Sequence, residues 1–326
     1  MRKNIHTIVY IFVLAAVLSL WSSLLRAQDF HLSQYDMLPL YYNPAQTGMY
    51  NAAENIPYRF SGTYRSQWQK LNGKPYAAVG AGYDMPFNRY GAGIVLMNHI
   101  AGASNFDAFQ MMLSGAYQIT DPSSKDHFLS AGLQMGIFQK KFSQRDLLFE
   151  NQYNGLAGFD PTLPNGESLA DLSIVRFDAN VGVYYKFTHP NKKWEPSIGF
   201  SLFHVTRPNE SFTGEKSRLP MRVNGIFNCD IHIDEKWTVT PNVLFMQQAR
   251  AREINAGALV AYTLNPKGYA LLSGASVRVK DSVIFHLGMK HRNNIFRISY
   301  DIVTSPLKQF SGSRGGFEMG FVYCGF

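Results

Sequence analysis

The most regular feature of the sequence is an alternation of apolar and polar residues in short segments between Tyr58 and Phe326. In the first segment, one face of an extended chain carries Tyr58, Phe60, Tyr64 and Trp68. The opposite face carries the polar and charged residues Arg59, Ser61, Thr63, Arg65 and Gln67. A period of two with aromatic rings on one side predicts a β-strand between two unlike environments.

Similar segments follow one another to the end of the chain and predict about fourteen strands, an even number as bacterial single-chain barrels require. Their predicted ranges are 58–68, 75–87, 91–100, 105–120, 127–139, 177–188, 195–204, 220–233, 237–248, 253–264, 268–279, 282–291, 295–303 and 316–326.

The lengths of the predicted connections also alternate. The even-numbered connections are all short, and the three longest connections, 140–176, 205–219 and 304–315, are odd-numbered. Outer-membrane barrels have short periplasmic turns and longer outer loops. The pattern therefore predicts an all-β fold: a transmembrane antiparallel β-barrel with an N-terminal periplasmic segment.

The N-terminus has the features of a secretory signal peptide. Arg2 and Lys3 precede an apolar stretch from Ile8 to Leu25, and Ala27 ends a plausible cleavage site. An uncleaved membrane anchor is the alternative, because 8–25 could almost span a bilayer. The predicted division is a signal peptide at 1–27, a periplasmic lead-in or plug segment at 28–57, and the barrel at 58–326.

Composition agrees with a barrel and argues against a nucleic-acid partner. Hydrophobic residues make up 46% of the chain, yet the mean hydropathy is only −0.15, because lumen-facing and lipid-facing residues average out. Of the net charge of +8, +3 belongs to the predicted signal peptide, so +5 remains. No dense Lys/Arg block is present, so the basic residues are expected to line the lumen or face lipid headgroups.

Candidate chemistry is sparse, and we expect a protein that is not an enzyme and holds no cofactor or metal. The His residues are scattered, and no pair has the spacing of a zinc motif. A barrel phospholipase would need a Ser, a His and an orienting group on the outer face, and His286 has no clear Ser partner by strand parity. Cys229 and Cys324 fall on opposite faces, so both are predicted to be unpaired.

Two segments are candidates for binding a partner. The long 140–176 loop combines acids, bases and aromatics, and long ordered loops are usually functional; a lid that only occludes the pore is the alternative. Asn43-Pro44 is a possible docking point for a periplasmic partner, with a purely structural turn as the alternative. The candidate residues are Asn43, Pro44, Arg145, Asp146, Tyr153, Phe159, Asp160 and Glu167.

Several short motifs, in this order and spacing, resemble the PorP/SprF family of outer-membrane proteins of the type IX secretion and gliding system. They are HLSQY at 31–35, LYYNPAQTG at 40–48, YRSQW at 64–68, NQY at 151–153, FDP at 159–161, LPNGE at 163–167, GFSLFH at 199–204, RPN at 207–209, SYD at 299–301 and GFE at 316–318. The end of the chain, Tyr323-Cys324-Gly325-Phe326, departs from the plainer aromatic ending expected for the family.

The resemblance implies a location in the outer membrane of a Gram-negative, Bacteroidota-type bacterium. It also implies partners: outer-membrane lipid, the periplasmic ring or motor-associated proteins of the secretion system, and a large secreted adhesin. The implied function is to help export such a protein or tether it at the surface by protein–protein binding. An outer-membrane channel for small or hydrophobic solutes is the alternative function.

Overall fold

The structure is a computed structural model of the chain. It describes residues 29–50, 56–67, 76–101, 106–121, 124, 126–142, 149–154, 158–160, 162–164, 173–189, 192–212, 214–265, 268–306 and 308–325.

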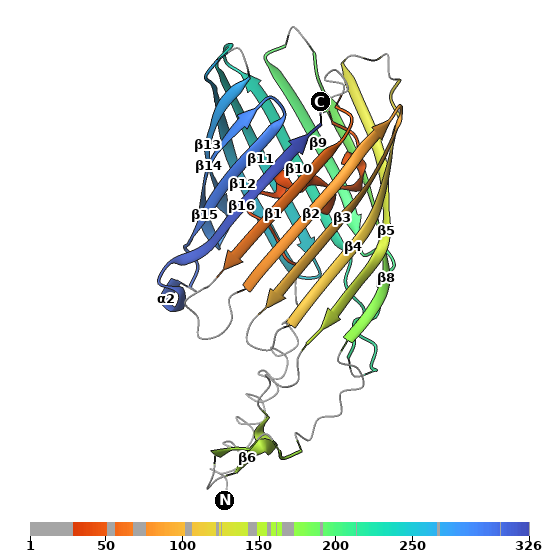
Figure 1. Ribbon diagram of the computed structural model, residues 1–326, viewed down its shortest axis with the longest axis vertical. Coiled ribbons are helices and arrows are strands. Elements are labelled where there is room, and N and C mark those ends of the chain that lie inside the picture. The colour runs from red at the N-terminus through yellow and green to blue at the C-terminus, as the bar shows by residue number, and fades with distance from the viewer. Residues whose placement is uncertain are drawn as a thin grey trace, which may run out of the picture.

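The described strands form one closed antiparallel barrel of fourteen strands, in which neighbours in sequence pair and β1 closes the barrel by pairing with β16 (Figure 1). The predicted all-β antiparallel barrel is therefore confirmed. The barrel strands are β1 (Arg59–Gln67), β2 (Tyr76–Phe87), β3 (Tyr90–Ala101), β4 (Phe106–Gln118), β5 (His127–Lys141), β8 (Ser173–Phe187), β9 (Trp194–Phe203), β10 (Arg222–His232), β11 (Trp237–Gln248), β12 (Ala251–Thr263), β13 (Tyr269–Arg278), β14 (Ser282–His291), β15 (Asn294–Val303) and β16 (Arg314–Cys324).

Strand boundaries agree closely with the predicted ranges, and the largest difference is at β8. This strand begins at Ser173 rather than at residue 177, and Ser173 pairs with Lys141 of β5. The early part of β8 was missed because Ile174 and Val175 are adjacent apolar residues, which hides the period of two. Pairing with β5, which is also long, extends β8 beyond the residues that show a clear alternation.

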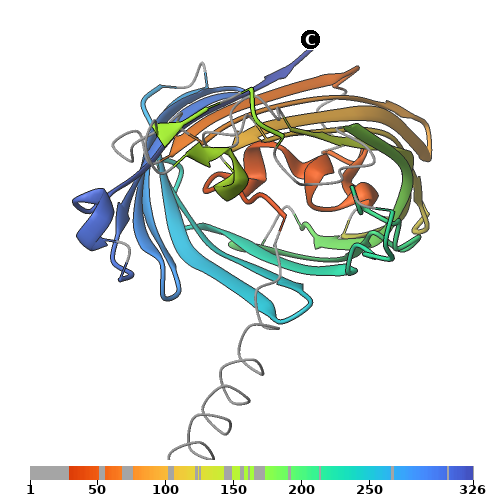
Figure 2. The same ribbon diagram turned by 90° about the horizontal axis from the view of Figure 1, so that it is seen from below.

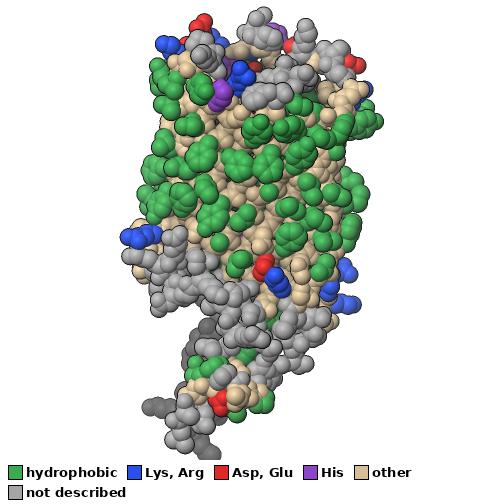
Figure 3. Space-filling model, in the orientation of Figure 1, with side chains coloured by type: hydrophobic (Ala, Val, Ile, Leu, Met, Phe, Trp, Pro, Cys, Tyr) green, Lys and Arg blue, Asp and Glu red, His purple; other side chains and the backbone are tan. Residues whose placement is uncertain are grey.

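The two faces of the strands differ as the alternation predicts. In β1, Phe60 and Tyr64 are exposed on the outside, whereas Ser61 and Arg65 are buried in the lumen. Figure 3 shows, on the face of the barrel that it presents, a broad band of outward apolar side chains with charged side chains at its two margins. Cys229 and Cys324 are both free, as predicted.

The two ends of the barrel differ in their connections. One end, called the loop end here, carries the long connections 142–172, 204–221 and 304–313. They include the small hairpin β6 (Tyr153–Asn154) and β7 (Gly158–Phe159), and helix α2 (Lys308–Ser311), at the bottom of Figure 1. The opposite end, called the turn end, carries the shorter even-numbered connections, such as residues 88–89 and 292–293. Because outer-membrane barrels carry their long loops on the outside of the cell, we expect the loop end to face outward.

Residues 29–50, called the plug here, lie inside the barrel, as Figure 2 shows in red and orange. The plug starts at the loop end, where Asp29 contacts Gln248 of β11, and reaches the turn end, where Gly48 contacts Asp84 of β2. It contains three single-turn 3₁₀ helices, η2 (Tyr35–Met37), η3 (Pro39–Tyr41) and η4 (Pro44–Gln46). Among the described residues, no helix has the length and apolar character needed to cross a membrane.

The remaining described helix is η7 (Glu150–Gln152), which precedes the β6–β7 hairpin in the long outer loop. The predicted signal peptide, 1–27, lies outside the described residues and stays a prediction.

Candidate functional site

The plug folds through proline and asparagine signals in its own sequence. Pro39 and Pro44 each occupy the first position of a 3₁₀ turn, where a missing N–H costs nothing. The side chain of Asn43 caps η4, because its Oδ1 accepts a hydrogen bond from the Ala45 N–H at 2.9 Å. Its Nδ2 donates to the backbone oxygen of Val183 in β8 at 2.9 Å, which fixes the turn to the barrel wall.

Apolar packing fills much of the space between plug and wall. The plug side chains Leu32, Leu38, Leu40 and Tyr42 have no exposed surface. They form one cluster with apolar lumen residues of β3, β4, β10 and β11, namely Val95, Met97, Met112, Ile226, Leu244 and Met246. A water-filled pore has polar walls, so these apolar lumen positions are explained by the plug that covers them.

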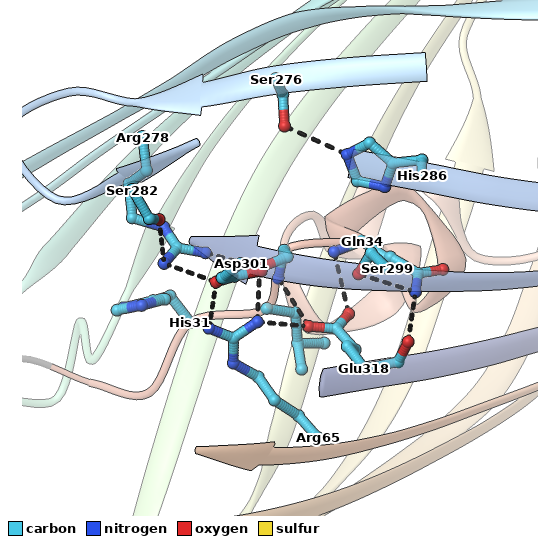
Figure 4. A network of polar contacts seen from close by, with 12 residues as sticks. His31, Gln34, Arg65, Ser276, Arg278, Ser282, His286, Ser299, Asp301 and Glu318 are labelled. Carbon is cyan, nitrogen blue, oxygen red and sulfur yellow. Dashed lines mark hydrogen bonds and ion pairs between the residues drawn. The ribbon is translucent and has the colours of Figure 1, made fainter. Parts of the chain in front are cut away.

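A buried polar network, called the seam cluster here, joins the plug to the strands where the barrel closes (Figure 4). Its members are Ser33, Gln34, Arg65, Arg278, Asp301 and Glu318. The Arg65 guanidinium of β1 pairs with Asp301 of β15 at 2.7 Å and with Glu318 of β16 at 2.9 Å. Arg278 of β13 adds a second cation, at 3.2 Å from Asp301.

The plug contributes its own groups to the seam cluster. The backbone N–H groups of Ser33 and Gln34 donate to the two carboxylate oxygens of Glu318, at 2.7 and 2.9 Å. The Ser33 hydroxyl donates to Asp301 at 2.8 Å and accepts from both Arg65 and Arg278. Two arginines and two carboxylates, bridged by one hydroxyl, leave these buried charges balanced and hydrogen-bonded.

A second buried group, called the Asp29 cluster here, holds the plug at the loop end; its members are Asp29, Asp178, His204 and Arg222. His204 follows β9 and lies between two carboxylates, with Nε2 at 2.6 Å from Asp29 and Nδ1 at 2.5 Å from Asp178. Burial lowers the pKa of His204, but the Asp29 and Asp178 carboxylates outweigh that effect and raise the pKa to about 9. The imidazole is therefore a cation at neutral pH.

At the turn end, a third group of charged residues holds the other end of the plug. The Arg59 guanidinium of β1 meets Asp84 of β2 with two contacts, at 2.9 and 2.7 Å, and Asp84 accepts from the Gly48 N–H at 2.6 Å. Close backbone approach needs glycine here: a Cβ on Gly91 of β3 would lie 1.8 Å from the Thr47 carbonyl oxygen.

The structure separates the partner-binding residues predicted from sequence. Asn43 and Pro44 are buried in the plug, and the Asn43 contacts described above are internal. Tyr153 and Phe159 pair across the β6–β7 hairpin with ring centroids 5.6 Å apart, and Asp160 follows them. Figure 1 shows this hairpin well beyond the ends of β5 and β8, at the outer tip of the molecule. Arg145, Asp146 and Glu167 lie outside the described residues.

One prediction about His286 is wrong. The residue does have a serine partner, because its Nε2 lies 3.1 Å from the Ser276 Oγ of the neighbouring strand β13 (Figure 4). The alternation along β14 assigns His286 to a face of the barrel, but it cannot show which residue of the neighbouring strand lies beside it. The two side chains face the lumen rather than lipid, and the Nδ1 of His286 has no hydrogen-bond partner among the residues that the structure describes. Within the described residues, no cluster of His, Cys, Asp and Glu is arranged to hold a metal.

Sequence reasoning quoted most of the seam cluster as separate motifs but did not predict that they meet. Ser33 and Gln34 belong to HLSQY, Arg65 to YRSQW, Asp301 to SYD and Glu318 to GFE. The available signal was a charged residue at a lumen-facing strand position inside the three strand motifs, namely Arg65, Asp301 and Glu318.

Comparison with known proteins places these motifs in one family. The family described as type IX secretion system membrane protein PorP/SprF matches residues 24–323. The chain belongs to the PorP/SprF family. It is therefore a type IX secretion system membrane protein, a β-barrel of the bacterial outer membrane in a secretion system of Bacteroidota.

Solved barrels resemble this PorP/SprF chain only distantly, and no curated protein matches it. A FadL homologue of Pseudomonas aeruginosa is 10% identical, with a TM-score of 0.48 over 86% of this chain and 92% of that one. The toluene transporter TodX of P. putida is 9% identical, with a TM-score of 0.46 over 86% of this chain and 91% of that one.

Proposed function

We propose that this PorP/SprF barrel works by protein binding: it helps export a secreted protein such as an adhesin, or tethers it at the cell surface. Its periplasmic turn end would meet ring or motor-associated proteins of the secretion system. The observation that carries the proposal is the plug, which occupies the lumen and is held to the wall at both ends and at the barrel seam. A filled barrel offers surfaces rather than a path for solutes.

The energetic argument concerns what an open pore would require. Withdrawing the plug would leave Glu318, Asp301 and Arg278 without their plug partners and would expose the apolar lumen residues that the plug covers. Breaking one buried charge pair costs about 3–5 kcal/mol. These contacts favour a binding role over the alternative, a channel for small or hydrophobic solutes.

The β6–β7 hairpin is the proposed contact for the secreted protein. Tyr153 is exposed, and its ring lies tilted against the Phe159 ring at the outer tip of the longest connection. Large aromatic side chains contribute much of the binding energy in protein interfaces. Short charged segments of the same loop, including Arg145, Asp146, Asp160 and Glu167, would complete the surface.

We also propose that the protein is not an enzyme. The Ser276–His286 pair lies in the lumen, and no described group orients the imidazole through Nδ1. A nucleophilic serine requires a base that is itself oriented. Purified barrel is expected to show no esterase activity; activity that disappears in both Ser276→Ala and His286→Ala would overturn this proposal.

The main test removes the exposed aromatic surface without changing the barrel. Tyr153→Ser combined with Phe159→Ser should reduce surface retention of the adhesin, while Tyr153→Phe, which keeps the ring, should not. Total export and surface-bound adhesin are measured in whole cells that carry each variant. If deleting the whole protein leaves both quantities unchanged, the proposed cargo role is wrong.

Two further measurements separate binding from transport. Affinity purification of a tagged copy after crosslinking should recover ring proteins or a large secreted protein. In planar bilayers, the purified barrel should show no defined open-pore conductance. Conductance that appears only when the seam cluster is disrupted would indicate that the plug is the barrier. A stable conductance of the unaltered barrel would support the alternative function, a channel for solutes.

A further inference from the structure

One half of the outer rim carries unpaired positive charge. Three neighbouring connections at the loop end, 249–250 after β11, 279–281 after β13 and 304–313 after β15, lie side by side around the barrel. They and the adjoining strand starts contribute five exposed cations, called the cationic rim here: Arg250, Arg252, Lys280, Lys308 and Arg314. Within the described part of the chain, none of the five forms an ion pair.

The acids nearest the cationic rim form their ion pairs with residues other than the five rim cations. Glu253, Asp281 and Asp301 all pair with the single guanidinium of Arg278, at 3.4, 2.9 and 3.2 Å. On the opposite side of the rim, Lys140 pairs with Glu210, and Lys141 lies 3.2 Å from Asp107, whereas Arg207, Lys216 and Arg218 of the 204–221 connection are exposed without an ion pair among the described residues. The cationic rim over β11–β16 is therefore the larger of two groups of exposed cations at the loop end, with five members against three.

A cavity of about 360 Å³ adjoins this half of the rim. Arg252 and Lys280 border it next to the acids Glu253 and Asp281, which both contact Arg278. Its inner wall is formed by His31 of the plug, Ser282 and the seam-cluster residues Arg278 and Asp301, which Figure 4 shows facing one another. The inner wall is polar and its charges are paired, so it suits an uncharged group rich in hydroxyls. The two bordering cations suit an anion attached to that group.

The position of the cationic rim relative to the apolar band indicates which kind of anion would bind there. Val277, Phe285 and Ile302, directly below the rim on β13, β14 and β15, are exposed on the outside, where they face lipid. The Arg252 guanidinium lies over the outward Phe245 ring, 5.9 Å from its centroid. The methylene groups of Arg252 can therefore pack on the apolar band while the guanidinium lies at the edge of that band. Figure 3 shows Lys and Arg side chains at this lower margin of the band. This is the level of headgroups in the outer leaflet.

We propose that the cationic rim and the adjoining cavity bind the phosphorylated sugar headgroup of an outer-leaflet lipid. Phosphate contacts Arg252 and Lys280, and the sugar hydroxyls enter the polar cavity. Lipid bound there would hold one side of the barrel at a fixed depth and orientation in the membrane. The site is distinct from the β6–β7 hairpin and does not depend on the proposed secretion role.

The test measures the thermal stability of the purified, full-length barrel in detergent with added lipid. Phosphorylated lipid A should raise the unfolding midpoint, and the same lipid with its phosphates removed should raise it much less. Arg252→Glu with Lys280→Glu should weaken lipid binding by more than about fivefold for each reversed charge, because removing one positive charge alone costs about fivefold. Lys141→Glu, at a lysine that already pairs with Asp107 on the opposite side of the rim, is the matched control and should bind as the unaltered protein does.

Each contrary outcome overturns the assignment. Equal binding of phosphorylated and dephosphorylated lipid would exclude phosphate recognition. Full stabilisation by inorganic phosphate alone would identify an ion site rather than a lipid site. Unchanged lipid binding in the reversed variant, with loss of an acidic protein partner, would assign the rim to protein.

If the double variant does not fold, Lys280→Asn provides the same test with little risk to the backbone. Lys280 has φ of +64°, a conformation that asparagine tolerates well. The expected result is again about fivefold weaker binding of phosphorylated lipid. Unchanged binding in this folded variant would count against the site.

Discussion

Arg65 of the first barrel strand and Glu318 of the last are joined by an ion pair of 2.9 Å across the seam where the barrel closes. Glu318 also accepts two backbone hydrogen bonds from the plug, so one carboxylate links the plug to both strands of the seam. The plug is therefore part of the closure of the barrel as well as the occupant of its lumen.

The first prediction concerns Arg65. Arg65→Met should destabilise the folded barrel by about 3–5 kcal/mol, because Asp301 and Glu318 stay buried and lose a cation. The free energy of unfolding in lipid vesicles measures the loss. The control is Lys141→Met in the Lys141–Asp107 pair, in which Lys141 is exposed; it should cost about 1 kcal/mol or less. Equal losses in the two variants would contradict a structural role for the seam cluster.

A second prediction tests how tightly the plug lies against the wall at the turn end. Gly91→Ala should displace plug residues 43–48 and cost about 1–3 kcal/mol, because the new methyl group meets the Thr47 carbonyl. Gly115→Ala is the control, since a Cβ there lies 3.8 Å from its nearest neighbour atom. Hydrogen exchange of plug amides should increase in the first variant alone; increased exchange in both would show that any added methyl group loosens the plug.

The Asp29 cluster predicts a pH dependence. Folding raises the pKa of His204 from 6.5 to about 9, so the protonated imidazole is the form that folding stabilises. Its contribution is complete below pH 6.5 and is lost as the pH rises toward 9. In His204→Gln, the plug should be less stable at neutral pH, and the decline across this range should disappear. Exchange of the Leu32 amide at several pH values measures this, and parallel profiles for the two proteins would rule it out.

The orientation of the barrel can be tested by labelling. In a Cys229→Ser, Cys324→Ser background, Lys280→Cys at the loop end should react with an impermeant maleimide on intact cells. Lys236→Cys, in the turn between β10 and β11, should react only after the outer membrane is opened. Both lysines are exposed, so accessibility of the side chain itself does not separate them. The reverse labelling pattern would place the loop end in the periplasm.

The sequence by itself determined the strands, their faces and their number. The alternation in β1 correctly separates Phe60 and Tyr64 from Ser61 and Arg65, because successive side chains of a strand must point to opposite faces. The order of short and long connections followed from the same segments, and it agrees with an up-and-down barrel. These properties are local, so a single sequence carries them.

Only the tertiary structure decided what fills the lumen and which charges meet there. Ser33 contacts Asp301 across 268 residues of chain, and Arg65 contacts Glu318 across 253. A period of two assigns each residue to a face but not to a partner on that face, since every lumen-facing charge is compatible with the same alternation. Barrel closure and the path of the plug bring these residues together, and both depend on the whole chain.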